Sequence, residues 1–314
     1  MRLAFMGTPD FALPAIQALA DTQNHEVVCV ITQPDKPKGR GRHLMAPPVK
    51  QYALEKDIPV LQPERIKGNR EIYASLEQLG LDAVIVVAYG KLLPADMLEI
   101  PKKGFINVHA SLLPYFRGAA PINRAILNGC TSTGVSIMKI DAGMDSGPVY
   151  LRAQIPISED DDAMSLSTKL SVLGADKLLE ALDLLERDQI TPVPQDHEQA
   201  TYAPMLNKDE GEIAWNCDPV TIHNMIRALV PWPCAYSHMG SKTLKIWKAS
   251  YLAEDHDLPA GTLVKDSSGL RITCSGGFII PTTLQLEGKK IMDSYAFSCG
   301  LRDERIRLSK GEIS

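Results

Sequence analysis

Residues 81–90 read LDAVIVVAYG, and this stretch carries the strongest strand pattern in the chain. Its apolar residues follow one another without alternating polar positions, which is typical of a strand buried on both faces. Strands of this kind belong to sheets that helices cover on both sides. The stretch therefore predicts a parallel sheet in an α/β domain.

Strand and helix patterns alternate along the chain on both sides of this stretch. The other predicted strands span residues 2–7, 26–32, 59–63, 104–110, 133–140 and 148–157. Apolar residues at helical spacing predict helices over residues 12–20, 46–57, 69–80, 120–129 and 165–186. This alternation favours an α/β fold with a mostly parallel sheet.

The last third of the chain has a different pattern. Residues 190–210 are rich in proline and polar residues, as in an interdomain linker. A helix beginning with Asp218 as N-cap follows, and then short strands separated by turns, which predict a small β-barrel such as an OB-fold. We therefore expect domains over residues 1–189 and 207–314, joined by a linker over residues 190–206.

Composition excludes several classes of protein. The 314 residues are 45% hydrophobic and 23% charged, which is globular, and no apolar run reaches the roughly 18 residues that a membrane span needs. The start of the chain lacks the pattern of a secretory signal. The six cysteines form no C-x-x-C pair and the seven histidines are dispersed, so neither a disulfide framework nor a metal site is expected. These features predict a cytoplasmic protein without a membrane segment.

Two polar residues interrupt the predicted strand in FINVHA, residues 105–110. Asn107 and His109 are two positions apart, so they share one side of the strand near its carboxyl end, where parallel sheets bind ligands. Together they offer two hydrogen-bond donors for one oxygen atom. The alternative is a pair of polar side chains satisfied by the backbone of a neighbouring loop.

A candidate carboxylate follows a later strand. Residues 141–147 read DAGMDSG, in which glycines bracket Asp145, although an aspartate between glycines more often caps a turn. We expect Asn107, His109 and Asp145 to meet at adjacent strand tips, with Gly90 permitting close approach of a ligand. Such a trio suits stabilisation of a tetrahedral oxyanion with proton transfer. No serine or cysteine is paired with the histidine, so the pattern favours direct acyl transfer without a covalent enzyme intermediate or a metal.

Two stretches are basic. The segment 33–50, QPDKPKGRGRHLMAPPVK, holds five basic residues and one acidic residue, a composition that suits phosphate contact but also an ordinary solvated loop. In the C-terminal barrel, Lys245 and Lys248 flank Trp247, a pattern compatible with nucleic-acid contact or with a routine strand. The candidate nucleic-acid contacts are Lys36, Lys38, Arg40, Arg42, Lys245 and Lys248.

Four of these segments resemble those of one enzyme family. VHASLLPYFRGAAPI, VVAYGKLLP, DAGMDSGPV and TQPDKPKGRGRHLMAPPVK are similar to segments of the bacterial methionyl-tRNA formyltransferases, and VPWPCAY (230–236) extends the resemblance into the C-terminal part. The resemblance implies a Rossmann-like catalytic domain and an OB-fold-like domain that binds tRNA. It also implies a monomer that uses 10-formyltetrahydrofolate to formylate methionyl initiator tRNA, without a metal.

The resemblance assigns roles to individual positions. The catalytic trio of the family falls on Asn107, His109 and Asp145, and its basic tRNA-reading insertion falls on residues 34–44. The positions that would bind the folate are Val87, Ala88, Tyr89, Gly90, Ser111, Leu112, Leu113, Pro114, Ile140 and Asp141. The chain departs from the family at Tyr115-Phe116, where Arg-Trp is common, and at His43, where lysine is frequent.

Two alternative functions follow from the same residues. Formyltransferases that act on a sugar amine or a purine-precursor amine share the trio and the SLLP turn, and only the basic loop and the barrel favour tRNA. A binding module that kept the fold without activity is the second alternative, although binding alone does not require Asp145.

Overall fold

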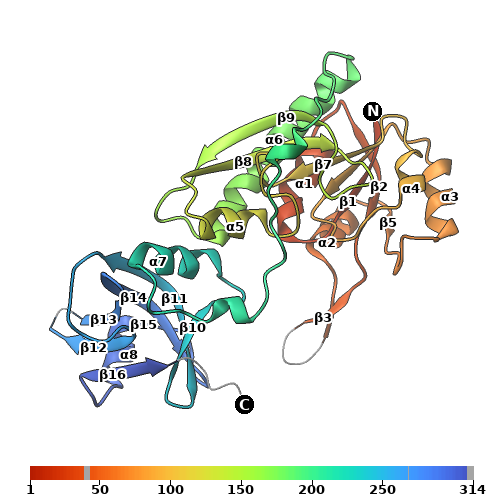
Figure 1. Cartoon of the computed structure of the whole chain (residues 1–314). Helices are drawn as coiled ribbons and strands as arrows, with labels where there is room; N and C mark the ends of the chain where they lie inside the picture. The colour runs from red at the N-terminus through yellow and green to blue at the C-terminus, as the bar shows by residue number, and fades with distance from the viewer. Residues whose placement is uncertain (39–42, 268, 310–314) are drawn as a thin grey trace. The chain divides into compact units, whose positions relative to one another are not determined.

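The computed structural model describes residues 1–38, 43–267 and 269–309, and it leaves the side chains of Lys38 and His43 undescribed. The chain divides into two compact units, coloured mostly red to green and cyan to blue in Figure 1. Unit 1 comprises Met1–Pro121, Ser132–Pro156 and Ser167–Pro204. Unit 2 comprises Ile122–Thr131, Ile157–Leu166 and Met205–Ser314.

Unit 1 is built on a seven-stranded sheet in the order β5-β2-β1-β6-β7-β8-β9. The strands β5, β2, β1, β6 and β7 are parallel, whereas β8 and β9 are antiparallel to their neighbours. The predicted mostly parallel sheet is therefore confirmed. The strands are β1 (Arg2–Gly7), β2 (Glu26–Ile31), β5 (Val60–Leu61), β6 (Ala83–Val87), β7 (Phe105–His109), β8 (Ser132–Lys139) and β9 (Val149–Pro156).

Helices cover both faces of this sheet, as the doubly apolar strands require. On β1, Leu3 and Phe5 pack on one face against α1, α2 and α6, whereas Ala4 and Met6 pack on the other against α3 and α4. The strand β6 is buried throughout and alternates between the same two clusters. The helices are η1 (Asp10–Ala12), α1 (Leu13–Asp21), α2 (Pro48–Glu55), α3 (Arg70–Gln78), α4 (Ala95–Leu98), α6 (Ala163–Glu186) and η2 (His197–Gln199).

The basic segment between β2 and α2 forms part of a short hairpin. Its strands β3 (Lys36–Lys38) and β4 (His43–Met45) pair antiparallel. At the base of the hairpin, the Lys50 ammonium donates to both Asp35 oxygens at 2.9 and 2.8 Å and to Gln62 at 2.7 Å. This network fixes where the hairpin leaves the sheet.

Unit 2 contains the predicted barrel. Its six strands close in the order β11-β10-β16-β12-β13-β14, because β14 also pairs with β11, and β15 extends from β14. The predicted N-cap is confirmed, since the Asp218 carboxylate accepts the Thr221 N–H at 3.0 Å. The elements are α5 (Pro121–Leu127), η3 (Asp209–Gly211), α7 (Pro219–Ala228), β10 (Ala235–Met239), β11 (Lys242–Leu252), β12 (Thr262–Asp266), β13 (Gly269–Cys274), β14 (Gly277–Leu286), β15 (Met292–Asp293), α8 (Ser294–Cys299) and β16 (Arg305–Ser309).

Among the described residues, no helix combines the length and the apolar composition needed to cross a membrane.

Candidate active site

The trio predicted from the sequence gathers around the end of β7. His109 is the last residue of that strand and only 6% exposed, and its Nδ1 lies 3.6 Å from Oδ2 of Asp145. Asn107 is half-buried and pairs through its backbone with Val86 and Met138. Within the described residues its side-chain amide has no hydrogen-bond partner. The site therefore offers an imidazole next to a carboxylate, and one amide donor that is not engaged.

Asp145 reaches this site by a different route from the one expected. Because β8 is antiparallel to β7, its last residue, Lys139, lies opposite Ile106 near the start of β7. The expectation that Asp145 follows an adjacent strand tip at the same edge was therefore wrong. The loop after β8 begins at the opposite end of β7 and folds back to bring Asp145 to His109.

Three hydrogen bonds hold this loop in place. The backbone N–H of Gly118 donates to Oδ2 of Asp145 at 2.8 Å. The side-chain amide of Gln195 donates to the carbonyls of Asp145 and Gly147 at 2.8 and 2.6 Å. A Cβ at Gly147 would lie 1.9 Å from the Lys139 carbonyl oxygen, so only glycine fits there. The carboxylate is thus fixed through both its side chain and its backbone.

The imidazole of His109 has acceptors on both sides. Its Nε2 lies 3.0 Å from the carbonyl oxygen of Phe116, and its Nδ1 faces the Asp145 carboxylate. Phe116 adopts a left-handed backbone conformation, with φ of +57°, and its N–H donates to the Thr201 hydroxyl at 2.8 Å. The Phe116 carbonyl can only accept, so Nε2 carries a hydrogen when this bond is made.

Arg117 and Gln195 have no role predicted from the sequence. The buried guanidinium of Arg117 donates twice to Gln195 Oε1, at 3.1 and 2.7 Å, and lies 3.2 Å from Nδ1 of His197. Arg117 therefore orients the amide that holds the Asp145 loop. Gln195 lies in the proline-rich stretch that was expected to be a linker, and its position between prolines and polar residues gave no sign of this contact.

Hydrogen bonds from β8 and β9 hold the SLLP turn, residues 111–114. The buried Ser136 hydroxyl accepts the Leu113 N–H at 3.0 Å and donates to the Ser111 carbonyl at 2.7 Å. Arg152 donates to the Leu113 carbonyl at 2.8 Å. Ser111 and Leu113 are buried, whereas Leu112 and Pro114 are half-buried. Of these predicted folate positions, the last two offer surface to a ligand.

The other predicted folate positions lie on two segments that pack against one core cluster. Tyr89 belongs to this cluster and is 1% exposed, and the side chain of Ile140 packs against it. Val87 is buried, Ala88 and Gly90 are exposed, and Asp141 is half-buried. Position 89 therefore offers almost no surface to a ligand.

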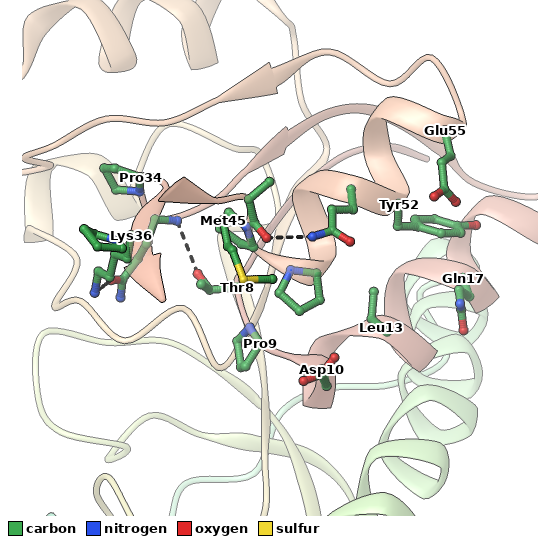
Figure 2. Close-up of a pocket in the computed structure, with 16 residues that line it drawn as sticks. Thr8, Pro9, Asp10, Leu13, Gln17, Pro34, Lys36, Met45, Tyr52 and Glu55 are labelled. Atoms are coloured by element: carbon green, nitrogen blue, oxygen red, sulfur yellow. Dashed lines mark hydrogen bonds between the residues drawn. The ribbon is translucent and has the colours of Figure 1, made fainter. Parts of the chain in front are cut away.

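A cavity of about 630 Å³ lies next to these strand tips, between the loop after β1 and the β3–β4 hairpin. Figure 2 shows Thr8, Asp10 and Lys36 among its lining side chains, and none of the trio lines it. Gln33 connects the cavity to the predicted folate segment, because its side chain donates to the Tyr89 carbonyl at 2.8 Å. The cavity therefore neighbours the candidate site without containing its reactive groups.

The predicted tRNA contacts are only partly described. Lys36 lies at the start of the hairpin and donates to Gln33 at 2.8 Å, whereas Arg40 and Arg42 lie outside the described residues. The side chain of Lys38 is likewise undescribed. On β11, Lys248 is exposed and Lys245 half-buried.

Comparison with known families finds two matches that together span most of the chain. Residues 1–182 match the family model described as "Formyl transferase", and residues 205–302 match "Formyl transferase, C-terminal domain".

Curated relatives resemble the chain over nearly its whole length. It is 45% identical to the methionyl-tRNA formyltransferase of Geotalea uraniireducens, over 96% of both chains. It is 47% identical to the protein of the same name from Desulforamulus reducens, over 96% of this chain and 95% of that protein.

Solved structures share the fold at lower identity. An N-formyltransferase from Helicobacter canadensis, in complex with folinic acid and dTDP-3-aminofucose, has a TM-score of 0.69 at 20% identity and covers 89% of this chain and 98% of its own. HypX from Aquifex aeolicus, in complex with tetrahydrofolic acid, has a TM-score of 0.62 at 17% identity, over 95% of this chain and 46% of its own.

Proposed function

The chain belongs to the methionyl-tRNA formyltransferase family, and we propose that it transfers the formyl group of 10-formyltetrahydrofolate to the amino group of methionyl initiator tRNA. The family match confirms the resemblance seen in the sequence and identifies the chain as a formyl-transferring enzyme. The observation that carries the proposal is that this match includes the C-terminal domain, while His109 and Asp145 pair at the end of β7.

The proposed reaction is a direct transfer. The amino nitrogen of the methionyl ester attacks the formyl carbon, a C–N bond forms, and the carbonyl electron pair moves onto the formyl oxygen. Collapse of this tetrahedral intermediate breaks the bond to N10 of the folate, which takes the proton that the attacking amine loses. The products are formyl-methionyl-tRNA and tetrahydrofolate.

The trio supplies hydrogen-bond donors for the oxyanion and a carboxylate that assists proton transfer. The free amide of Asn107 donates a hydrogen bond to the developing oxyanion, and one such donor is typically worth about 10²–10³ in rate. His109 donates the second hydrogen bond. Asp145 holds the imidazole and assists transfer of the amine's proton to N10 of the folate.

The Phe116 carbonyl has a specific place in this proposal. It accepts from His109 Nε2 at 3.0 Å in the structure, so the formyl oxygen must share or replace this contact to receive the same hydrogen. The Asp145 contact at Nδ1 does not have to change. The ring thus keeps its orientation while the hydrogen bond from Nε2–H moves from the Phe116 carbonyl to the reacting oxygen.

The folate is proposed to lie along the exposed parts of the two loop segments. Ala88 and Gly90 are exposed, and Leu112, Pro114 and Asp141 are half-buried, so all five offer surface. The tRNA is proposed to approach past the hairpin, where Lys36 lines the cavity, and to contact Lys245 and Lys248 on the barrel. We propose that the reaction takes place in the cytoplasm and that the active species is a monomer.

The donor is tested by supplying formyl-labelled 10-formyltetrahydrofolate or the 5-formyl isomer to the purified protein with charged initiator tRNA. We expect formyl-methionine after hydrolysis of the ester only with the 10-formyl donor. Equal transfer from both donors would contradict the proposed attack at the N10-bound formyl carbon. Light scattering during turnover should give the mass of one chain, and a dimer mass would contradict the monomer proposal.

A further inference from the structure

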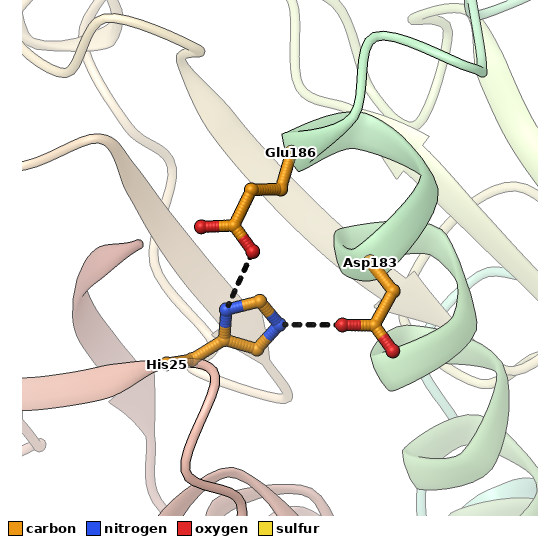
Figure 3. A group of neighbouring side chains, drawn as sticks. All are labelled: His25, Asp183 and Glu186. Carbon is orange, nitrogen blue, oxygen red and sulfur yellow. Dashed lines mark ion pairs between the residues drawn. The ribbon is translucent and has the colours of Figure 1, made fainter.

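Outside the trio, two histidines of unit 1 contact charged groups in the described part of the chain. Figure 3 shows the imidazole of His25 between the carboxylates of Asp183 and Glu186, which lie 3.5 and 3.9 Å from its two nitrogens. This group lies at the start of β2, at the opposite edge of the sheet from the end of β7, because the two strands are parallel. His197 faces a cation instead, and its contacts lead to the trio.

Residues 195–203 form a strap along the loop that follows β7. Every second residue of the strap contacts residues 115–120. The contacts are those of Gln195 and His197 with Arg117, of Gln199 with Tyr115, of Thr201 with Phe116, and of Ala203 with Arg117 and Ala120. Because the Phe116 carbonyl also contacts His109, the strap supports the segment that holds the catalytic ring.

The guanidinium of Arg117 is a buried cation whose side-chain acceptors are neutral. The residue is 4% exposed, and no carboxylate of the described residues forms an ion pair with it. Its Nη2 donates to Gln195 Oε1 at 2.7 Å and lies 3.2 Å from Nδ1 of His197. A guanidinium can only donate, so this nitrogen accepts and carries no hydrogen. The contact is therefore made only while the imidazole of His197 is neutral.

We propose that His197 is a positioning residue for formyl transfer, which in its neutral form steadies Asp145 through Arg117 and Gln195. The Gln195 amide donates to the Asp145 and Gly147 carbonyls at 2.8 and 2.6 Å, and Arg117 orients this amide. The inference rests on the proposed function, because the group that is positioned belongs to the trio of that reaction.

Protonation of His197 breaks this chain of contacts. A charged ring in the same place would lie 3.2 Å from a buried guanidinium that has no counterion, and two like charges repel strongly there. His197 is exposed, so its charged ring can turn into water. The Nη2 atom of Arg117 then loses its second acceptor, and the Gln195 amide that holds the Asp145 loop becomes less well oriented.

The other charged groups near His197 do not offset this repulsion. On the strap itself, the Asp196 carboxylate accepts the Glu198 N–H at 3.1 Å and the Gln199 amide at 2.7 Å. Within the described ranges, neither Asp196 nor Glu198 forms an ion pair with the ring, and from the loop after β7 its polar contact is with the Arg117 guanidinium. Asp145 bonds to the Gly118 N–H and faces His109 instead.

The test compares two variants at His197 over the pH range in which imidazoles become charged, from 8 to 5.5. His197→Asn places an amide oxygen near the position of Nδ1, and this oxygen accepts from Arg117 at every pH in the range. His197→Ala has no acceptor. At pH 8, His197→Ala should lower kcat by at least about fivefold, and His197→Asn should recover most of this loss.

The pH profile separates positioning from a merely structural role. The ratio of wild-type kcat to that of His197→Asn should fall by at least about threefold between pH 8 and 5.5, whereas the ratio of His197→Ala to His197→Asn should stay constant. Such ratios cancel the titration of His109 and of the attacking amine, which all the proteins share. His238→Gln, in the barrel, is the matched control, and its ratio to the wild type should not change with pH.

A second measurement needs no substrate. The NMR signal of the Gln195 side-chain amide, assigned with Gln195→Ala, should shift between pH 8 and 5.5 in the wild type and stay in place in His197→Asn. A constant ratio of wild-type kcat to that of His197→Asn would overturn the proposal, as would an amide signal with the same pH dependence in both proteins. If the wild type formylates no tRNA, the proposed function fails, and the amide signal alone decides whether His197 controls Gln195.

Discussion

The Nδ1 atom of His109 lies 3.6 Å from Oδ2 of Asp145, and the same oxygen accepts the backbone N–H of Gly118 at 2.8 Å. One carboxylate therefore has two functions. It supplies negative charge next to the imidazole, and it anchors the turn that follows β7. Because an amide can replace the second function but not the first, the two can be separated experimentally.

Asp145→Asn should remove the charge and keep the anchor, because the amide oxygen can still accept the Gly118 N–H. We expect kcat to fall by about 10²–10⁴-fold, the range of a lost acid–base contribution, with little change in KM for folate or in unfolding temperature. Steady-state kinetics measures kcat and KM, and a thermal melt measures the unfolding temperature. A change confined to KM would show that Asp145 binds substrate instead.

Gln195→Ala should release the Asp145 loop without changing any side chain of the trio. The variant loses hydrogen bonds to the Asp145 and Gly147 carbonyls and leaves Arg117 without its main acceptor. Displacing a reactive group by about 1 Å can cost on the order of 10²-fold, so kcat should fall markedly while the protein stays folded. Gln189→Ala, at an exposed side chain, is the control. Equal kcat values in the two variants would show that Gln195 does not position Asp145.

Tyr89→Phe should not lower the free energy of unfolding. The Tyr89 hydroxyl is buried and has no hydrogen-bond partner among the described residues, so removing it relieves a desolvation cost. Burial also raises the pKa of Tyr89 to about 12, above the unfolded value of about 10. The wild type should therefore lose stability relative to the variant as the pH rises above about 10. Urea denaturation at neutral and alkaline pH tests this, and a less stable variant at pH 7 would show that the hydroxyl has a partner.

Arg40→Ala should weaken tRNA engagement and leave folate affinity unchanged. Arg40 lies outside the described residues, and its position between glycines in KGRG motivates this prediction. If Arg40 contacts a phosphate, the log–log salt slope of tRNA binding should fall by about 0.7–0.9, and Arg40→Lys should restore only part of the affinity. Unchanged kcat/KM for charged tRNA at several salt concentrations would indicate that the loop is only a solvated surface.

The sequence predicted the parallel sheet and the barrel because both follow from local patterns. The doubly apolar run of β6 requires cover on both faces, and Asp218 followed by Pro219 marks the start of α7. The same patterns could not reveal that β8 runs antiparallel, because strand direction depends on where the chain crosses the sheet. The route of Asp145 to His109 was therefore missed.

Contacts between segments far apart in the sequence could not be predicted either. Gln195 reaches Asp145 across 50 residues, and His25 reaches Asp183 across 158 residues. No spacing rule links such pairs, since each residue is polar and ordinary in its own neighbourhood. Motif spacing found the trio because Asn107 and His109 share one strand, and resemblance to a family supplied Asp145 with its role.

A competition experiment tests the choice of methionyl initiator tRNA as acceptor most directly. Labelled 10-formyltetrahydrofolate is given to the enzyme with equal concentrations of methionyl initiator tRNA and a dTDP-linked amino sugar, and the two products are separated and counted. We expect the label to appear as formyl-methionine on tRNA, with the amino sugar unmodified. Formyl transfer to the sugar amine at a comparable or higher rate would contradict it.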